Sequence, residues 1–151
     1  MERKAYGKIN LGLSVLGRRP DGYHQVDMIM QSISLADTVS FAPGEGLSLV
    51  CDNPDLPCDG SNLMVKAARA FSAKTGLAVN WHLACTKRIF LAAGLAGGST
   101  DAAAVLRGAP TTFAGSPWTG RPWRNWRPVS AATFLSVCTE APRGPGDGGK
   151  R

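Results

Sequence analysis

A loop of small residues that runs straight into an alanine-rich segment constrains this chain more than any other feature. Residues 92–104 read Ala-Ala-Gly-Leu-Ala-Gly-Gly-Ser-Thr-Asp-Ala-Ala-Ala. Glycine lets the backbone approach an anion closely and adopt positive φ. A helix that begins near residue 99 would point its free N–H groups and positive dipole end at that anion, and Ser99 and Thr100 would add hydroxyl donors. The pattern favours a phosphate-binding loop, with a plain strand-to-helix turn as the alternative.

Two common nucleotide motifs are absent from this loop. No lysine follows the glycines, which excludes a P-loop of the G-x-x-x-x-G-K-[ST] kind. The spacing G-x-G-x-x-G is also missing from this loop, so a Rossmann dinucleotide site has no support here. If the loop binds phosphate, it does so with backbone N–H groups and hydroxyls alone.

Apolar and polar residues alternate near the start of the chain, over residues 6–16. This period predicts a strand. Its buried face would hold Ile9, Leu11, Leu13 and Val15. Lys8 and Asn10 would share the other face, where glycine leaves room for a polar cleft. An ordinary solvent-facing edge explains the same pattern, and both interpretations stay open.

A tight turn follows this strand at Pro20-Asp21-Gly22, because proline presets φ and glycine accepts the left-handed region. Tyr23 and His24 leave the turn side by side. An aromatic ring beside a hydrogen-bonding imidazole suits a flat polar heterocycle such as a nucleobase. A pair of merely exposed side chains is the alternative.

Three segments together resemble the GHMP kinase superfamily: Gly7-Lys8-Ile9-Asn10-Leu11, residues 19–24, and residues 93–103. More narrowly, they are similar to the kinases of the bacterial and plastid isoprenoid pathway. The resemblance covers residues 5 to about 108, in the family's order and spacing. It implies an α+β fold, the GHMP kinase amino-terminal domain of the ribosomal protein S5-like type, present here incompletely.

The resemblance also implies an activity and roles for named residues. The reaction would be ATP-dependent phosphorylation of the 2-hydroxyl of cytidine-diphosphate-linked methylerythritol, a small-molecule substrate of non-mevalonate terpenoid biosynthesis, with Mg²⁺ as the second cofactor. Lys8 falls on the catalytic lysine, and Asn10, Tyr23 and His24 fall on substrate-holding positions. Asn62 lies near the adenine position. The ATP phosphate loop would comprise Leu91, Ala92, Ala93, Gly94, Leu95, Ala96, Gly97, Gly98, Ser99 and Thr100.

The chain departs from the family pattern in two places. Phe90 stands where members usually have a proline, which removes a φ constraint before the loop. After Gly108, no Gly-Ala-Asp-Val-Pro-like segment with the catalytic aspartate is found. Asp101 is not expected to replace that aspartate, because an acidic first helical turn is ordinary dipole complementarity. The alternative function is therefore a catalytically inert fragment with at most weak nucleotide binding.

Composition changes abruptly after Gly108, which predicts a kinase part at residues 1–108 and an unrelated part at 109–151. The second part holds six of the ten prolines and three of the four tryptophans. We interpret it as the product of a frameshift near codon 108 of a GC-rich gene. An Arg/Trp nucleic-acid arm and a disordered extension are the alternatives. Most of the chain's formal net charge of +6 belongs to this part, so it does not indicate a nucleic-acid partner for the folded part.

The coarse secondary structure follows from periodicity and cap residues. We expect strands near residues 5–16, 25–34, 37–42, 47–51 and 78–85. In the last of these, Val79, Trp81, Leu83 and Cys85 alternate. A helix over 62–75 would begin at Ser61 or Asn62 as its cap and end at Gly76, and a second helix would begin near 99.

Cysteine spacing and hydropathy limit the remaining possibilities for metal sites, cellular location and membrane spans. Cys51, Cys58, Cys85 and Cys138 lack metal-ligand spacing, so we expect no metal site and reduced thiols in a cytoplasmic protein. No apolar run is long enough to span a membrane and no signal peptide is seen. The sequence does not predict an oligomeric state.

Overall fold

One mixed sheet and two helices make up the fold in the computed structural model, which describes residues 1–20 and 22–112. In chain order the elements are β1 (Glu2–Arg18), β2 (His24–Pro43), β3 (Ser48–Cys51), α1 (Leu63–Thr75), β4 (Trp81–Thr86) and α2 (Gly97–Thr112). The predicted α+β class is confirmed. The interpretations of residues 113–151, including Cys138, lie outside the described residues.

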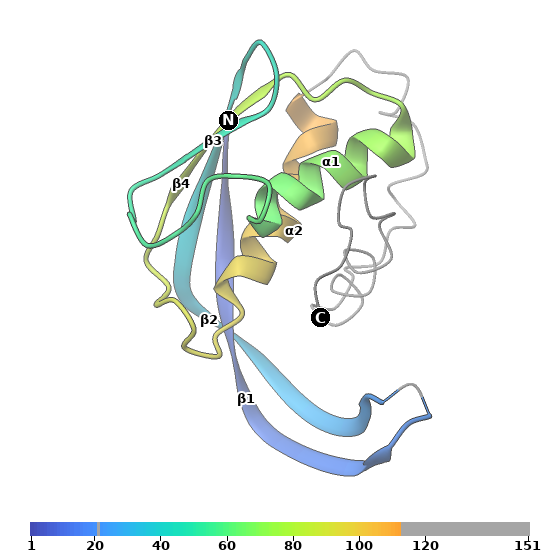
Figure 1. The fold of residues 1–151 in the computed structure, drawn as a ribbon. Helices are drawn as coiled ribbons and strands as arrows, with labels where there is room; N and C mark the ends of the chain where they lie inside the picture. The colour runs from blue at the N-terminus through green and yellow to red at the C-terminus, as the bar shows by residue number, and fades with distance from the viewer. Residues whose placement is uncertain (21, 113–151) are drawn as a thin grey trace.

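The sheet has the strand order β1-β2-β4-β3. β1 pairs antiparallel with β2 from Glu2–Ser40 to Arg18–His24, and β2 pairs antiparallel with β4. β3 runs parallel to β4, so the chain must cross over between them, and α1 makes that crossover. Both helices lie on the same face of the sheet (Figure 1).

The core lies between that face and the helices. Trp81 and Leu83 of β4 are buried, and the Trp81 ring contacts Phe71 of α1 with 5.6 Å between ring centroids. Cys85 completes the buried face of β4, as the alternation predicts, whereas the strand begins at Trp81 and leaves Val79 before it. α2 packs on β1 and β2, and α1 packs on α2.

Helix α1 begins and ends as its cap residues predict. The Met64 N–H donates to Asn62 Oδ1 at 2.8 Å, which satisfies one of the free donors of the first turn. Gly76 lies in the left-handed region with φ 72°, and its N–H donates to the Ser72 carbonyl at 2.8 Å. Both ends of α1 are thus fixed by local chemistry.

Helix α2 begins two residues earlier than predicted, at Gly97. It continues through Gly108 to Thr112, so residue 108, where the composition changes, lies inside the helix. The assignment of 1–108 and 109–151 to different parts stays a prediction. Neither described helix has the length and apolar composition needed to cross a bilayer.

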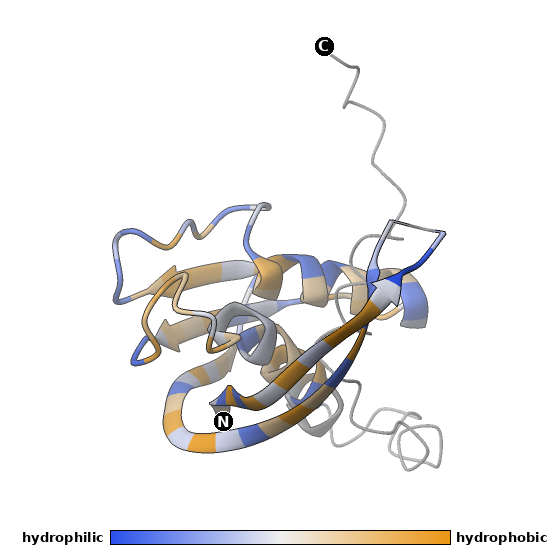
Figure 2. Cartoon of the chain, turned by 90° about the horizontal axis from the view of Figure 1, so that it is seen from below, coloured by the Kyte–Doolittle hydropathy of each residue, from blue (hydrophilic) through white to orange (hydrophobic). Residues whose placement is uncertain are grey.

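The outer part of the β1–β2 hairpin corrects two predictions. The strands expected at 25–34 and 37–42 form one continuous strand, β2. The face predicted to be buried is exposed instead, at 37% for Ile9, 63% for Leu11, 56% for Leu13 and 61% for Val15. The hairpin curves away from the helices, and Figure 2 shows apolar positions along both of its strands. No described helix covers this part, and register shifts interrupt the period of two.

A close contact between α2 and β2 predicts a large effect of a small substitution. A Cβ on Gly108 would lie 2.4 Å from the Phe41 ring, which is buried. We expect Gly108→Ala to lower the free energy of unfolding by about 1–3 kcal/mol through overpacking. Gly98→Ala is the matched control in the same helix, because its Cβ would meet only Leu63 at 3.4 Å. Urea unfolding measures both variants, and equal stability of the two would contradict the prediction.

Candidate functional site

The loop between β4 and α2 has an unusual backbone. Ala92, Gly94 and Ala96 have positive φ of 56°, 73° and 63°, and they alternate with residues of negative φ. Such an alternation forms a concave nest of successive N–H groups that binds anions. Two of the three left-handed positions are alanines, whereas the sequence pointed to glycines. Each such alanine costs about 1–2 kcal/mol, strain of a kind that clusters at functional sites.

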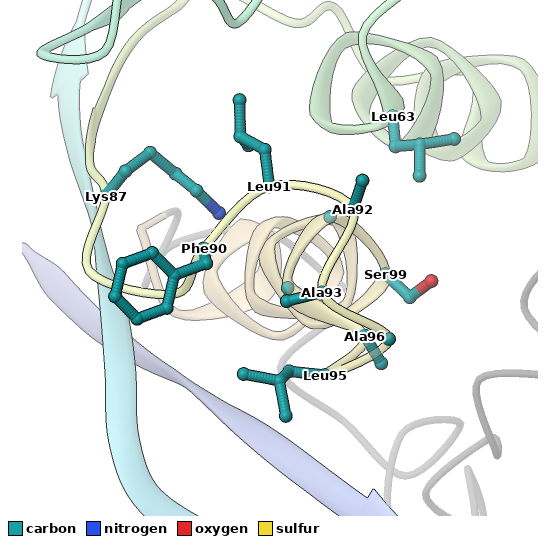
Figure 3. A pocket seen from close by; sticks show the side chains of 12 residues that line it. Leu63, Lys87, Phe90, Leu91, Ala92, Ala93, Leu95, Ala96 and Ser99 are labelled. Carbon is teal, nitrogen blue, oxygen red and sulfur yellow. The ribbon is translucent and has the colours of Figure 1, made fainter.

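The loop and the start of α2 enclose a hollow of about 280 Å³ (Figure 3). Its lining comprises Leu63, Lys87, Phe90, Leu91, Ala92, Ala93, Gly94, Leu95, Ala96, Gly97, Gly98 and Ser99. The lining thus combines the nest with the first turn of α2, whose N–H groups lack intrahelical partners. The ring of Phe90 is exposed at the rim.

The two hydroxyls at the start of α2, those of Ser99 and Thr100, differ in the hydrogen bonds that they make. Ser99 lines the hollow. The Thr100 hydroxyl donates back to its own helix, with carbonyl oxygens at 2.9 Å in Gly97 and 3.3 Å in Ala96. Of the two predicted hydroxyl donors, only Ser99 therefore lines the hollow without a bond back to the helix.

Strand β1 brings Lys8 and Asn10 to this loop. The Lys8 backbone N–H donates to the Leu95 carbonyl at 3.0 Å, which joins β1 directly to the nest. The Lys8 ammonium donates to Asn10 Oδ1 at 3.4 Å, so these two side chains share one face as predicted. The strand that carries the Lys8 ammonium is therefore hydrogen-bonded to the loop through its backbone.

Tyr23 and His24 lie elsewhere. They leave the tip of the β1–β2 hairpin, where His24 pairs with Arg18, ten residues along β1 from Lys8. Ten strand residues span roughly 30 Å, and Figure 1 shows the tip well separated from the loop. Tyr23 is 68% exposed. The described structure does not bring this pair to the loop, and its substrate role stays a prediction.

Asn62 has a structural task in the described structure. Besides capping α1, its amide N–H donates to the Pro57 carbonyl at 2.6 Å, and the side chain is buried. The neighbouring Leu63 lines the hollow. Asn62 therefore places one wall of the hollow, while its own polar atoms are engaged.

A buried charge cluster that the sequence analysis missed lies beneath the loop. The Lys87 ammonium donates to the carboxylates of Asp37 on β2 and of Asp101 on α2, the latter at 2.8 Å. Asp37 also accepts backbone N–H groups from Arg88 at 2.5 Å and Ile89 at 2.8 Å. The sequence did contain a signal for this cluster, namely charged residues within apolar segments. It did not show which charges pair, because the partners are distant in sequence.

The cluster corrects the expectation for Asp101. Because α2 begins at Gly97, Asp101 lies beyond the first turn, and its carboxylate is buried against Lys87 instead of complementing the helix dipole. Its Oδ1 is buried and has no hydrogen-bond partner. Asp37, Lys87 and Asp101 are the buried charged side chains in the described part of the chain.

Burial and pairing act differently on the three groups. Burial raises the pKa of Asp101 to about 6, since Lys87 offsets the loss of water only in part and the neighbouring Asp37 charge adds to the rise. Burial also opposes ionisation of Asp37, but the Arg88 and Ile89 N–H groups and Lys87 outweigh it and lower that pKa. For Lys87, the two carboxylates outweigh burial and raise the pKa.

These shifts predict an unusual pH dependence for one variant. A carboxyl with a pKa near 6 when folded and 3.8 ordinarily stabilises the fold at low pH and loses that contribution as pH rises between these values. The full difference corresponds to about 3 kcal/mol. Asp101→Asn keeps an oxygen for Lys87 and cannot ionise. We therefore compare the unfolding free energy of Asp101→Asn with that of the natural chain. As pH rises from about pH 4 to pH 7, we expect the difference to shift in favour of the variant by up to that amount. Urea unfolding at both pH values tests this, and a pH-independent difference would contradict it.

Comparisons with known proteins bear on the same residues. The family model described as the GHMP kinases N terminal domain matches residues 62–124. A 4-diphosphocytidyl-2-C-methyl-D-erythritol kinase of Prosthecochloris aestuarii is 45% identical over 104 residues, which are 69% of this chain and 36% of that protein. A kinase of the same name from Carboxydothermus hydrogenoformans is 50% identical over 104 residues, with the same coverage. The matched part of the chain spans about a third of the length of these relatives.

Two solved structures have a similar fold. A crystal structure of 4-(cytidine 5′-diphospho)-2C-methyl-D-erythritol kinase has a TM-score of 0.66 and 33% identity, and the match covers 91% of this chain and 46% of that one. Streptococcus pneumoniae phosphomevalonate kinase, in complex with phosphomevalonate and AMPPNP, has a TM-score of 0.54 at 13% identity, covering 93% and 47%. The second likeness concerns the fold alone.

Proposed function

The chain carries the amino-terminal domain of the GHMP kinase family, and on this premise we propose that its loop at residues 91–100 binds the phosphates of ATP. The reaction served is phosphorylation of the 2-hydroxyl of 4-diphosphocytidyl-2-C-methyl-D-erythritol, in non-mevalonate isoprenoid biosynthesis. One observation carries the proposal. A nest of alternating φ at Ala92, Gly94 and Ala96 leads into the N-terminus of α2, with Lys8 hydrogen-bonded to the same loop.

The loop suits a polyphosphate for physical reasons. Backbone N–H groups of a nest and of a free helix N-terminus bind oxyanions without any side-chain charge. Gly97 lets the start of α2 pack closely on Ile89, which a Cβ would meet at 3.0 Å, and so places the helix N-terminus at the hollow. Ser99 adds a hydroxyl at the same end. ATP supplies the phosphoryl group when bound, and Mg²⁺ would accompany its phosphates.

Lys8 is the residue of this chain that we assign to the transfer itself. Phosphoryl transfer depends mainly on positioning and on stabilisation of charge. The Lys8 ammonium, held by Asn10 Oδ1, lies on the strand that is hydrogen-bonded to the loop. It would offset charge as the phosphoryl group moves to the substrate hydroxyl.

The remaining predicted residues complete this proposal. Asn10, Tyr23 and His24 would contact the substrate, the last two near its cytosine. Asn62 would act on the adenine side of the hollow through the start of α1, because its own amide is engaged. The cytoplasm is the proposed location, where the free thiols of Cys51, Cys58 and Cys85 stay reduced.

A second candidate function is nucleotide binding without turnover. It is favoured by the sequence after Gly108, where no Gly-Ala-Asp-Val-Pro-like segment is found. Such a segment is implied by family resemblance to carry the catalytic aspartate. Under this candidate function, the loop binds ATP but no phosphorylated substrate is formed.

The test is a turnover assay of the purified 151-residue chain with ATP, Mg²⁺ and 4-diphosphocytidyl-2-C-methyl-D-erythritol. Formation of ADP together with phosphorylated substrate supports the kinase proposal. ATP binding without product supports the second candidate. A chain that neither binds ATP nor forms product would contradict both.

A further inference from the structure

The buried cluster of Asp37, Lys87 and Asp101 lies directly against the wall of the hollow. Lys87 itself lines the hollow (Figure 3), and its ammonium lies 3.3 Å from where a Cβ on Gly97 would stand. Gly97 is the first residue of α2 and lines the same hollow. Charges in this cluster therefore act on an anion in the loop, because its side chains are buried and Lys87 borders both the cluster and the hollow.

The cluster carries one more negative charge than positive when both carboxylates are ionised. Its single cation, Lys87, is shared between Asp37 and Asp101. An anion arriving in the loop adds negative charge beside this excess. One proton on a carboxyl removes the excess, so the protonated cluster accepts the anion more readily.

We propose that a polyphosphate binds in the loop together with a proton that is taken up from solvent by the Asp101 carboxyl. This inference rests on the proposed function, since it takes ATP as the ligand. Because linkage is reciprocal, protonation of Asp101 then strengthens ATP binding by the same factor by which ATP favours the proton.

Geometry selects Asp101 over its neighbours as the carrier of the proton. Asp37 accepts two backbone N–H groups besides Lys87, so its ionised form is well stabilised. Asp101 accepts from Lys87 alone, and its buried Oδ1 has no partner. An oxygen that bears charge without a donor is the one that gains most from protonation.

No other described group facing Asp101 competes for this role. Cys85 lies close enough to interact with it, but burial raises the pKa of that thiol, which stays neutral. The buried face of α1 is apolar, and it consists of Met64, Val65, Ala67, Ala68 and Phe71. β1 contributes the buried Ala5 and Gly7. Without ATP, the Asp101 carboxyl has a pKa of about 6 and is only partly protonated near neutral pH.

The test follows the Asp101 carboxyl by ¹³C NMR in the complete chain labelled at aspartate, with and without saturating ATP. Assignment through the backbone avoids dependence on a variant. We expect the titration midpoint to move upward by about one pH unit or more with ATP. Adenosine, which lacks phosphates, should leave it unchanged.

ATP affinity is measured separately on the same sample, so the two proposals fail in different ways. ATP that binds without moving the Asp101 midpoint overturns this inference and leaves the proposed function standing. Failure to bind ATP overturns the proposed function and this inference with it. A second measurement uses the Asp101→Asn variant. Its ATP affinity should vary less between about pH 6 and pH 8 than that of the natural chain. An equal variation in both would overturn the proton uptake.

Discussion

Lys87→Met is expected to lower the free energy of unfolding by about 3–5 kcal/mol. The side chain is buried and is the cation that faces Asp37 and Asp101 in this cluster. Methionine has a similar volume, so the loss would not come from a cavity. It would come from two buried carboxylates left without their counter-charge, and one of them already has an unpartnered oxygen.

Urea unfolding at neutral pH measures this effect, and an exposed lysine provides the matched control. Lys66 on α1 is exposed, so Lys66→Met makes the same chemical change at the surface and should stay within about 0.5 kcal/mol of the natural chain. If Lys87→Met costs no more than Lys66→Met, the buried ion cluster does not stabilise this fold.

Lys8→Ala is expected to reduce ATP-dependent phosphorylation of the substrate by about 10²–10³-fold, the usual cost of removing one group that stabilises transition-state charge. The loss should fall on kcat more than on KM, because this charge matters most as the phosphoryl group moves. Stability should change little, since the Lys8 ammonium has one described partner, Asn10, in an exposed contact.

Lys4→Ala is the control for this prediction. Lys4 lies on the same strand, and its ammonium donates to Thr38 Oγ1 at 2.9 Å in an exposed contact. Removing it alters net charge equally but leaves the loop untouched. An equal loss of activity in both variants would mean that overall charge, and not the position of Lys8, governs the reaction.

The parts of the fold that the sequence predicted are those controlled by neighbouring residues. Asn62 and Gly76 fix the ends of α1 through bonds within a few positions. The buried face of β4 follows from a period of two at Trp81, Leu83 and Cys85. Such signals need no knowledge of the distant chain.

The parts that the sequence did not predict depend on distant contacts. The alternation at Leu11, Leu13 and Val15 predicts a strand correctly, but whether that face is buried depends on what packs against it, and no described element does. The ion cluster joins Asp37 to Lys87 across fifty residues. Its existence depends on how β2, β4 and α2 meet.

The sequence likewise predicted some features of the candidate site and not others. A small-residue loop before a helix predicted an anion site, and the nest at Ala92, Gly94 and Ala96 has the backbone geometry for one. That alanines would take the left-handed conformation was not visible, because glycine is the residue that normally signals it. The position of Lys8 against Leu95 also required the fold.

Binding of ATP compared with adenosine tests the central claim most directly, because the two ligands differ only in the phosphates assigned to the loop. Isothermal titration calorimetry on the 151-residue chain gives both dissociation constants. The loop account predicts that ATP binds at least roughly tenfold more tightly than adenosine, a difference of about 1.4 kcal/mol or more. Equal affinity for the two ligands, or no ATP binding, would contradict it.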